Sequence, residues 1–269
     1  MSLKLSLHTQ PDVPLEADVI APDKISGMDN VAIAKLAIFH GSDKAVLGDF
    51  FKVEGKNDGT VEVRGKLDKV KMLGAAMNSG RLKISGNAGM HLGAAMSGGE
   101  IIVSGNAGDW VGAEMAGGRI TVKGNIGHMA GAAYRGGTAG MSGGEILVHG
   151  NAGNEAGNTM LNGLIAIGGD CADFAGVNMK AGTLVVFGDL GPRAGASMRR
   201  GTLVGMGEAE MLPTFTFDCV YHPLFLRPYL HYLRQEGFEV AESQIKGRYE
   251  RWSGDSIEMN RGEALLLVG

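Results

Sequence analysis

Cysteine is scarce in this sequence of 269 residues, and long apolar runs and an excess of basic charge are missing. The two cysteines, Cys171 and Cys219, are too few for a disulfide framework, so we expect two free, buried thiols. No apolar run approaches the ~20 residues that a membrane helix needs, and residues 1–20 lack the apolar core of a signal peptide. A formal net charge of −4 gives no general attraction to nucleic acid or to anionic membranes. We therefore expect a cytoplasmic protein that binds neither.

The residue patterns that usually build metal and catalytic sites are also missing. Seven histidines are scattered along the chain without an HxH or HExxH pattern. A metal site needs His, Cys or carboxylate ligands that converge, and a catalytic site needs an assembled nucleophile or base. We therefore predict no metal ligand and no catalytic residue on this chain.

Glycine, in contrast, is abundant, with 45 residues, and it recurs with a period of nineteen. Two successive units read GRLKISGNAGMHLGAAMSG from Gly80 and GEIIVSGNAGDWVGAEMAG from Gly99. Further units begin at Gly118, Gly144, Gly163 and Gly182. A fixed period of this length is typical of a stacked, quasi-one-dimensional fold.

Each unit combines a short strand with a second buried column. The third and fifth positions are apolar and mostly β-branched, which predicts a strand with one buried face. The seventeenth position is methionine throughout: Met77, Met96, Met115, Met141, Met160, Met179 and Met198. Nineteen residues do not divide into the hexads of a left-handed β-helix. We therefore predict an all-β fold, a right-handed parallel β-helix of about seven coils.

The repeats leave a flanking segment on each side. We assign residues 1–57 to an N-terminal capping arm, 58–207 to the β-helix and 208–269 to a C-terminal capping segment. The last segment includes a short helix expected within residues 222–236, with Pro223 near its start. Uncovered ends of a β-helix expose unpaired strand edges, so we expect both arms to cover them.

The outward-facing strand positions change from polar in the early coils to apolar in the late coils. Large exposed apolar patches mark interaction surfaces. The residues expected to contact a partner are Leu164, Val185, Phe187, Val204 and Met206. The C-terminal segment could equally cover this patch, and both alternatives stay open.

One coil carries seven extra residues, within GAAYRGGTAGMSGG. Insertions in a solenoid emerge as loops on one face, which is often the binding face. Tyr134 and Arg135 are therefore further candidates for partner contact, the alternative being a bulge that is merely tolerated.

Two polar groups lie in the last coils. Arg193, Arg199 and Arg200 could hold the acidic tail of a coenzyme, or form a solvated face. At the eighth position a column of asparagines gives way to Asp170, Asp189 and Glu208. A β-helix hydrolase would use such a carboxylate row. The late coils offer few lysines and no aromatic platform for a sugar, so we favour solvated corner residues.

The repeated G-x-x-G-x-x-x-G unit with its methionine endings resembles the GXGXG family of β-helices. That family includes the C-terminal domain of the glutamate synthase large subunit and the C subunit of formylmethanofuran dehydrogenase. GDFFKVEG before the first coil, MLPTF after the last and HPLFLRPYLHYLRQEGF in the tail resemble this C subunit. The tail is similar to the bacterial version, found in the formyltransferase/hydrolase complex.

The resemblance implies a non-catalytic scaffold subunit in a hetero-oligomer with catalytic subunits of A, B and D type. The complex would be a molybdenum or tungsten formylmethanofuran dehydrogenase, or would move a formyl group from tetrahydromethanopterin to a methanofuran-type carrier and release formate. It implies no cofactor on this chain, the coenzyme and any metal lying in other subunits. Two alternatives stay open: a module that binds a polyglutamyl coenzyme tail through the three arginines, and a glutamate synthase-type module.

Overall fold

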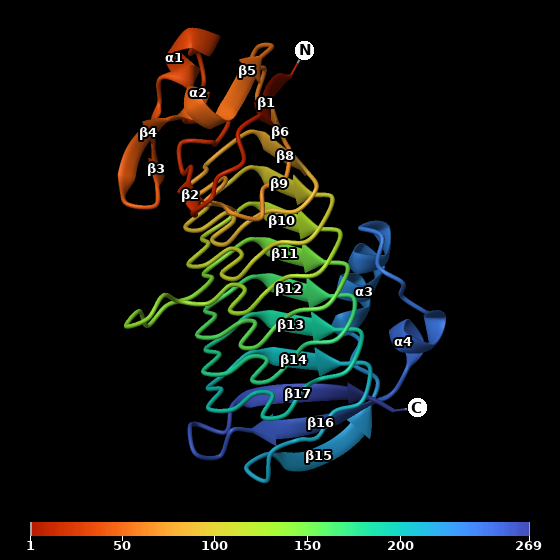
Figure 1. The fold of residues 1–269 in the computed structure, drawn as a ribbon. Helices are drawn as coiled ribbons and strands as arrows, with labels where there is room; N and C mark the ends of the chain where they lie inside the picture. The colour runs from red at the N-terminus through yellow and green to blue at the C-terminus, as the bar shows by residue number, and fades with distance from the viewer. Residues whose placement is uncertain (1, 269) are drawn as a thin grey trace.

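The computed structural model describes residues 2–268, which form mostly β-sheet with a few short helices (Figure 1). Within these residues thirteen strands build one long sheet, and four shorter strands build a second sheet near the N-terminus. No helix in residues 2–268 has the length and apolar character needed to cross a membrane.

The middle of the long sheet is a parallel stack with one strand from each repeat. Its strands are β6 (Thr60–Arg64), β8 (Arg81–Ser85), β9 (Glu100–Val103), β10 (Arg119–Val122), β11 (Glu145–Val148), β12 (Leu164–Ile167), β13 (Thr183–Val186) and β14 (Thr202–Gly205). Equivalent positions of successive repeats lie opposite each other, as Ile101 does to Ile120. A second parallel ladder of single bridges runs from Leu67 to Leu190. The nineteen-residue period is therefore the spacing of stacked, parallel coils.

The interior of the stack is the apolar core expected from the repeat. The third and fifth positions, for example Ile101 and Val103, are fully buried. All seven methionines of the seventeenth position are buried as well, which confirms the predicted interior column. At Gly112 the backbone is left-handed, with φ +61, and an added Cβ would lie 2.6 Å from Ile146 Cδ1. Glycine is required there because the turn closely approaches Ile146 of β11 in the core.

The N-terminal arm extends the first end of the long sheet. Strand β1 (Leu3–Leu7) pairs in parallel with β6 and antiparallel with β5 (Phe51–Glu54), which is the edge strand. The second sheet and two short helices lie beside this end: β2 (Leu15–Glu16), β3 (Ala37–His40), β4 (Asp43–Val46), β7 (Val70–Lys71), α1 (Asn30–Ala34) and α2 (Leu47–Phe50).

The C-terminal segment extends the other end and also covers one face. Strand β17 (Gly262–Leu267) pairs in parallel with β14, and β16 (Tyr249–Gly254) and β15 (Thr216–Tyr221) follow antiparallel. The predicted helix forms as α3 (Leu226–Gln235), and with α4 (Glu242–Lys246) it lies beside the late coils (Figure 1).

The two cysteines have different surroundings. Cys171 is buried in the coil stack, and this burial raises the pKa of its thiol to about 12. Cys219 is exposed, so the expectation of two buried thiols was wrong for this residue. The reason is that Cys219 lies on β15, an edge strand with few covering groups.

Candidate functional site

Helix α3 of the same chain packs against the apolar outer face of the late coils. A second hydrophobic cluster joins Leu147, Ala166 and Val185 of the strands to Leu226, Leu230 and Leu233 of α3. The residues expected to contact a partner lie within or against this cluster: Leu164, Val185, Val204 and Met206 are buried, and Phe187 is half-buried. Phe187 stacks on Phe238 with ring centroids 5.5 Å apart. The prediction that these five residues contact a partner is therefore corrected. They pack against the C-terminal segment of the same chain, which covers their apolar surface.

A polar clamp of Arg119, Glu145, Tyr232 and Glu236 borders the contact between α3 and the coils. Glu145 Oε2 accepts a hydrogen bond from the Tyr232 hydroxyl at 2.6 Å and another from Arg119 Nε at 3.0 Å. Arg119 also pairs with Glu236 at 3.1 Å, at the end of α3. Burial, and then the Glu145 carboxylate, raise the pKa of Tyr232, so its hydroxyl stays a donor. The clamp therefore ties α3 to β10 and β11 by charge-assisted hydrogen bonds.

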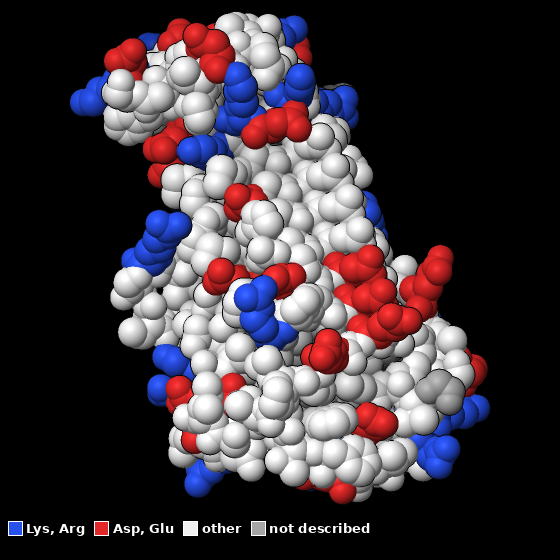
Figure 2. Space-filling view, turned by 60° about the horizontal axis from the view of Figure 1, so that its bottom comes forward, with Lys and Arg blue, Asp and Glu red and all other residues white. Residues whose placement is uncertain are grey.

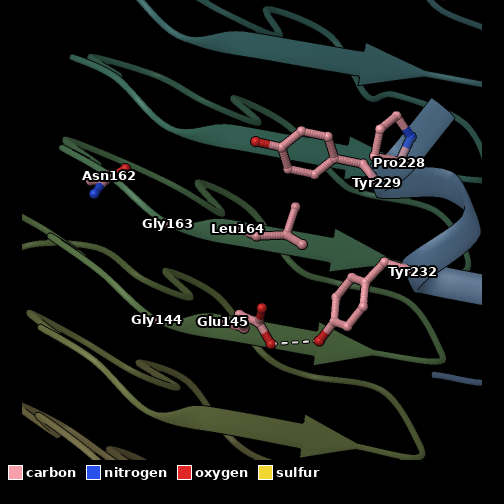
Figure 3. A pocket seen from close by; sticks show the side chains of 8 residues that line it. All are labelled: Gly144, Glu145, Asn162, Gly163, Leu164, Pro228, Tyr229 and Tyr232. Carbon is pink, nitrogen blue, oxygen red and sulfur yellow. Dashed lines mark hydrogen bonds between the residues drawn. The ribbon is translucent and has the colours of Figure 1, made fainter. Parts of the chain in front are cut away.

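A hollow of about 380 Å³ opens next to this clamp. Figure 3 shows Tyr229 of α3 in front of strand β13 and Tyr232 of α3 reaching toward Glu145 of β11, with Leu164 of β12 between the two tyrosines. Gly163 and Asn162 complete the coil side of the hollow. Its lining is mostly apolar with one engaged carboxylate, so it fits an apolar side chain better than a charged ligand.

The insertion within the repeat that begins at Gly118 projects as a loop from the coils (Figure 1). Tyr134 lies at its base, stacked on Trp110 with centroids 5.0 Å apart, and its hydroxyl lies 3.0 Å from His91 Nδ1. Burial lowers the pKa of His91 and raises that of Tyr134, so both rings are neutral near pH 7. Arg135 is exposed at the start of the projecting part. The loop thus presents a cation beside a firmly packed aromatic cluster.

Sequence reasoning missed the partners of Tyr134. The twelfth position of each coil adopts a left-handed backbone without glycine: Met72, His91, Trp110, Met129, Glu155, Phe174 and Arg193. A bulky residue in this conformation carries strain of roughly 1–2 kcal/mol. The signal available in the sequence was the absence of glycine at a corner where large side chains recur. Trp110 is one of these corner residues, and the structure stacks it on Tyr134.

The three candidate arginines do not converge. Arg193 pairs with Asp173 at 2.6 Å and lies 4.2 Å over the Phe174 ring, while Arg199 pairs with Glu258 at 2.9 Å. Arg200 lines a different hollow from Arg199. The arginines that share the hollow of Arg200 are Arg251 and Arg261, which sequence reasoning missed because they come from the C-terminal segment. The predicted three-arginine site for an acidic coenzyme tail is therefore not assembled, and the residues do not fit that group.

The polar column at the eighth position is a structural ladder. From Asn87 to Asp189, the side-chain oxygen of each residue in the column accepts a hydrogen bond from the backbone N–H one coil further on. Asn87 accepts from Asn106 at 3.0 Å, and Asp170 accepts from Asp189 at 2.9 Å. These side chains therefore satisfy the corners of successive coils. Among residues 2–268, no group of three or more His, Cys, Asp or Glu side chains is arranged to hold a metal ion.

Comparison with known proteins agrees with the coil geometry. A family model described as the GXGXG motif matches residues 62–215, more than half of the chain. The chain belongs to the GXGXG motif family. The match begins within β6 and ends beyond β14, so the GXGXG motif is the stacked, parallel part of the long sheet.

Two curated relatives match part of the chain. The C subunit of the molybdenum-containing formylmethanofuran dehydrogenase 1 of Methanothermobacter marburgensis is 43% identical over 82 residues, covering 30% of this chain and 20% of the relative. The C subunit of the tungsten-containing formylmethanofuran dehydrogenase 2 of Methanothermobacter wolfeii is 42% identical over 93 residues, covering 33% and 34%. The matched segments thus span only a fifth to a third of these relatives.

Among the solved structures that match, one covers almost the whole length of this chain. It is a chain in the crystal structure of the formyltransferase/hydrolase complex (FhcABCD) from Methylorubrum extorquens in complex with methylofuran. The TM-score is 0.93 at 32% identity, and the match covers 99% of this chain and 100% of that chain. The similarity therefore includes both terminal segments as well as the coils.

Proposed function

We propose that this chain is a non-catalytic scaffold subunit, of the C type, in a formyltransferase/hydrolase complex. The observation that carries the proposal is the full-length match to a chain of such a complex, with a TM-score of 0.93. The partial matches to the C subunits of two dehydrogenases support the subunit type. They cover about a third of this chain, which favours the formyltransferase/hydrolase over a dehydrogenase.

In this proposal the chemistry takes place on partner subunits of A, B and D type. A formyl group passes from tetrahydromethanopterin to a methanofuran-type carrier and leaves as formate, and the carrier and any metal are held by those partners. The alternative of a binding module for a polyglutamyl coenzyme tail is not favoured, because two of its three arginines are engaged by Asp173 and Glu258. Nothing in the geometry favours a glutamate synthase-type module.

The finer fold prediction, a right-handed β-helix with about seven coils, belongs to the same proposal. The continuous parallel ladder from Leu67 to Leu190 supports it. The division into an arm at 1–57, coils at 58–207 and a capping segment at 208–269 is proposed with it. A cytoplasmic location also remains a prediction.

The insertion loop is the proposed partner contact on the coils. Arg135 is exposed, and Tyr134 packs against Trp110 and His91. A packed aromatic residue beside an exposed arginine is typical of an interface hot spot. The loop also projects from a face that no part of the described chain covers in Figure 1.

Co-expression with candidate A, B and D subunits tests the scaffold role. The full-length chain carrying an affinity tag is expected to co-purify with them and to co-elute as one species on size exclusion. The catalytic subunits alone should assemble poorly. A chain that elutes alone in the presence of all three candidates would overturn the proposal.

A deletion of residues 134–140 tests the loop. It joins Ala133 to Met141 and produces GAAMSGGE, the sequence that the chain already uses at positions 93–100. Folding should therefore be retained, as an unchanged circular dichroism spectrum would verify, while affinity for the partners falls at least tenfold. Lys56→Ala, which removes an exposed cation elsewhere, is the control and should bind as before. Unchanged binding by the deletion variant would remove the loop from the interface and leave the scaffold role intact.

A further inference from the structure

The two edges of the long sheet are protected very differently. At the N-terminal end, the edge strand β5 has only four residues, carries Lys52 and Glu54, and packs against α1 and α2. At the C-terminal end, β15 has six residues, of which all but Tyr221 are exposed. Within residues 2–268 its only paired neighbour is β16. Edges are protected by being short, charged, bulged or covered; β15 has one charged residue and one register irregularity, but it is longer than β5 and no other described element packs over its outer side.

The side chains of β15 add an apolar surface to this open edge. Phe217 is 47% exposed and Val220 is 42% exposed. Asp218 is the one charged residue of the strand, and it is engaged by Ser253 and by Arg251. Figure 2, which brings the C-terminal end forward, shows this part of the surface mostly without charged side chains. An open, apolar strand edge of this kind is a template for pairing with another strand.

An irregularity in β15 restricts which strand can pair with it. Phe217 lies opposite Trp252, and Val220 lies opposite Glu250. Trp252 and Glu250 are two residues apart and share a hydrogen bond of 3.0 Å, so they lie on one face of the sheet. Phe217 and Val220 therefore share that face, although three residues separate them. The cause is one extra residue near Asp218, a β-bulge.

We propose that two copies of this chain pair through β15, antiparallel, about a two-fold axis between Asp218 and Cys219. In that register Phe217 lies opposite Val220 of the second copy, and Thr216 lies opposite its Tyr221. Each pair lies on one face, and Phe217 with Val220 is a favourable aromatic and β-branched pair. Asp218 meets Cys219, so no like charges lie opposite each other. The two long sheets thereby become one.

The bulge is the reason to prefer a second copy over an ordinary strand. A regular partner would place the residues opposite Phe217 and Val220 on different faces, because its side chains alternate strictly. A second copy brings its own extra residue to the same point and restores the match. The resulting contact is self-complementary, as a two-fold interface requires. This inference does not depend on the proposed function.

Cross-linking of the exposed Cys219 thiol tests the proposed pairing of two β15 strands. The two-fold register places the two Cys219 residues next to the axis, within about 8 Å of each other. A short bis-maleimide should therefore join two full-length chains, and Cys219→Ser should abolish the product. Cys171 does not compete, since it is buried and its pKa is raised to about 12. Light scattering of the untreated protein should give twice the chain mass of 28.0 kDa.

A charge on the edge should break the dimer without unfolding the chain. Val220→Lys is expected to raise the dimer dissociation constant at least tenfold, because lysine on an edge strand opposes pairing. Val31→Lys, at a residue that is 63% exposed on α1, is the matched control and should remain dimeric. Equal unfolding midpoints for the two variants would exclude a folding defect.

Three results would overturn the proposal. The first is a monomer at all accessible concentrations with no cross-linked product. The second is a dimer that Val220→Lys leaves unchanged. The third is a Cys219 that becomes protected only when partner subunits are added, which would assign the edge to a strand of another protein.

Discussion

The early and late coils share one interior and have two different exteriors. In β8 the outward residues Arg81, Lys83 and Ser85 are exposed, and the strand alternates between buried and exposed positions. In β12 all four residues are buried, because α3 covers the outer face. The inner residues are equally buried in both. The comparison teaches that the repeat determines the inside of the stack, whereas the flanking segments decide what each outer face does.

The largest effect should come from a charge on the covered outer face. Val185→Asp places a carboxylate beneath α3, where Val185 has no solvent exposure. We expect a loss of about 4 kcal/mol in the free energy of unfolding, since an unpaired buried charge has no compensating partner. Lys83→Ser on the open face should change it by less than about 0.5 kcal/mol. Urea unfolding followed by circular dichroism measures both, and equal losses would break the comparison.

The interior should show no such difference between the early and late coils. Met96 and Met198 occupy the same coil position and are both fully buried. Replacing either by Ala leaves a cavity and should cost about 3 kcal/mol of unfolding free energy. Losses that differ by more than about 1.5 kcal/mol would mean that the two ends of the core are packed differently.

A smaller loss is expected when the helix that covers the late coils is weakened. Leu230 is fully buried between α3 and the sheet. Leu230→Ala should cost about 2 kcal/mol, because α3 can settle partly into the space that is left. Leu224→Ala is the matched control, since Leu224 is 64% exposed. Limited proteolysis should cut the 208–248 segment faster in Leu230→Ala alone, and equal cutting would argue against α3 as the cover.

The smallest effect belongs to the polar clamp. Tyr232→Phe removes the hydrogen bond to Glu145 and should cost about 1 kcal/mol. Because the folded pKa of Tyr232 is raised above its ordinary value of 10, its contribution is complete below pH 10 and is lost as the pH rises further. The unfolding free energy of the wild type should therefore fall more steeply above pH 10 than that of Tyr232→Phe. Parallel pH profiles would mean that the hydroxyl does not stabilise the folded state.

The features that recur in every coil could be predicted from the sequence. Several features that occur only once in the chain could not. The strands, the methionine column and the helix near Pro223 followed from spacing and local signals. The eighth-position column was read as solvated corners, and the structure adds that each side chain holds the next coil. Cys219 was misjudged, because its exposure depends on where the edge of the sheet falls. The arginine cluster was misjudged because nearby positions in the sequence point toward different hollows.

The sequence by itself determined the stacked core, since every coil repeats the same contacts with its neighbours and a period of nineteen encodes them all. Only the tertiary structure decided which surfaces remain open. The outer patch of the late coils is covered by α3, Tyr134 is backed by Trp110, and β15 is left unpaired on its outer side. Each of these outcomes depends on contacts between segments far apart in the chain, which no repeat specifies.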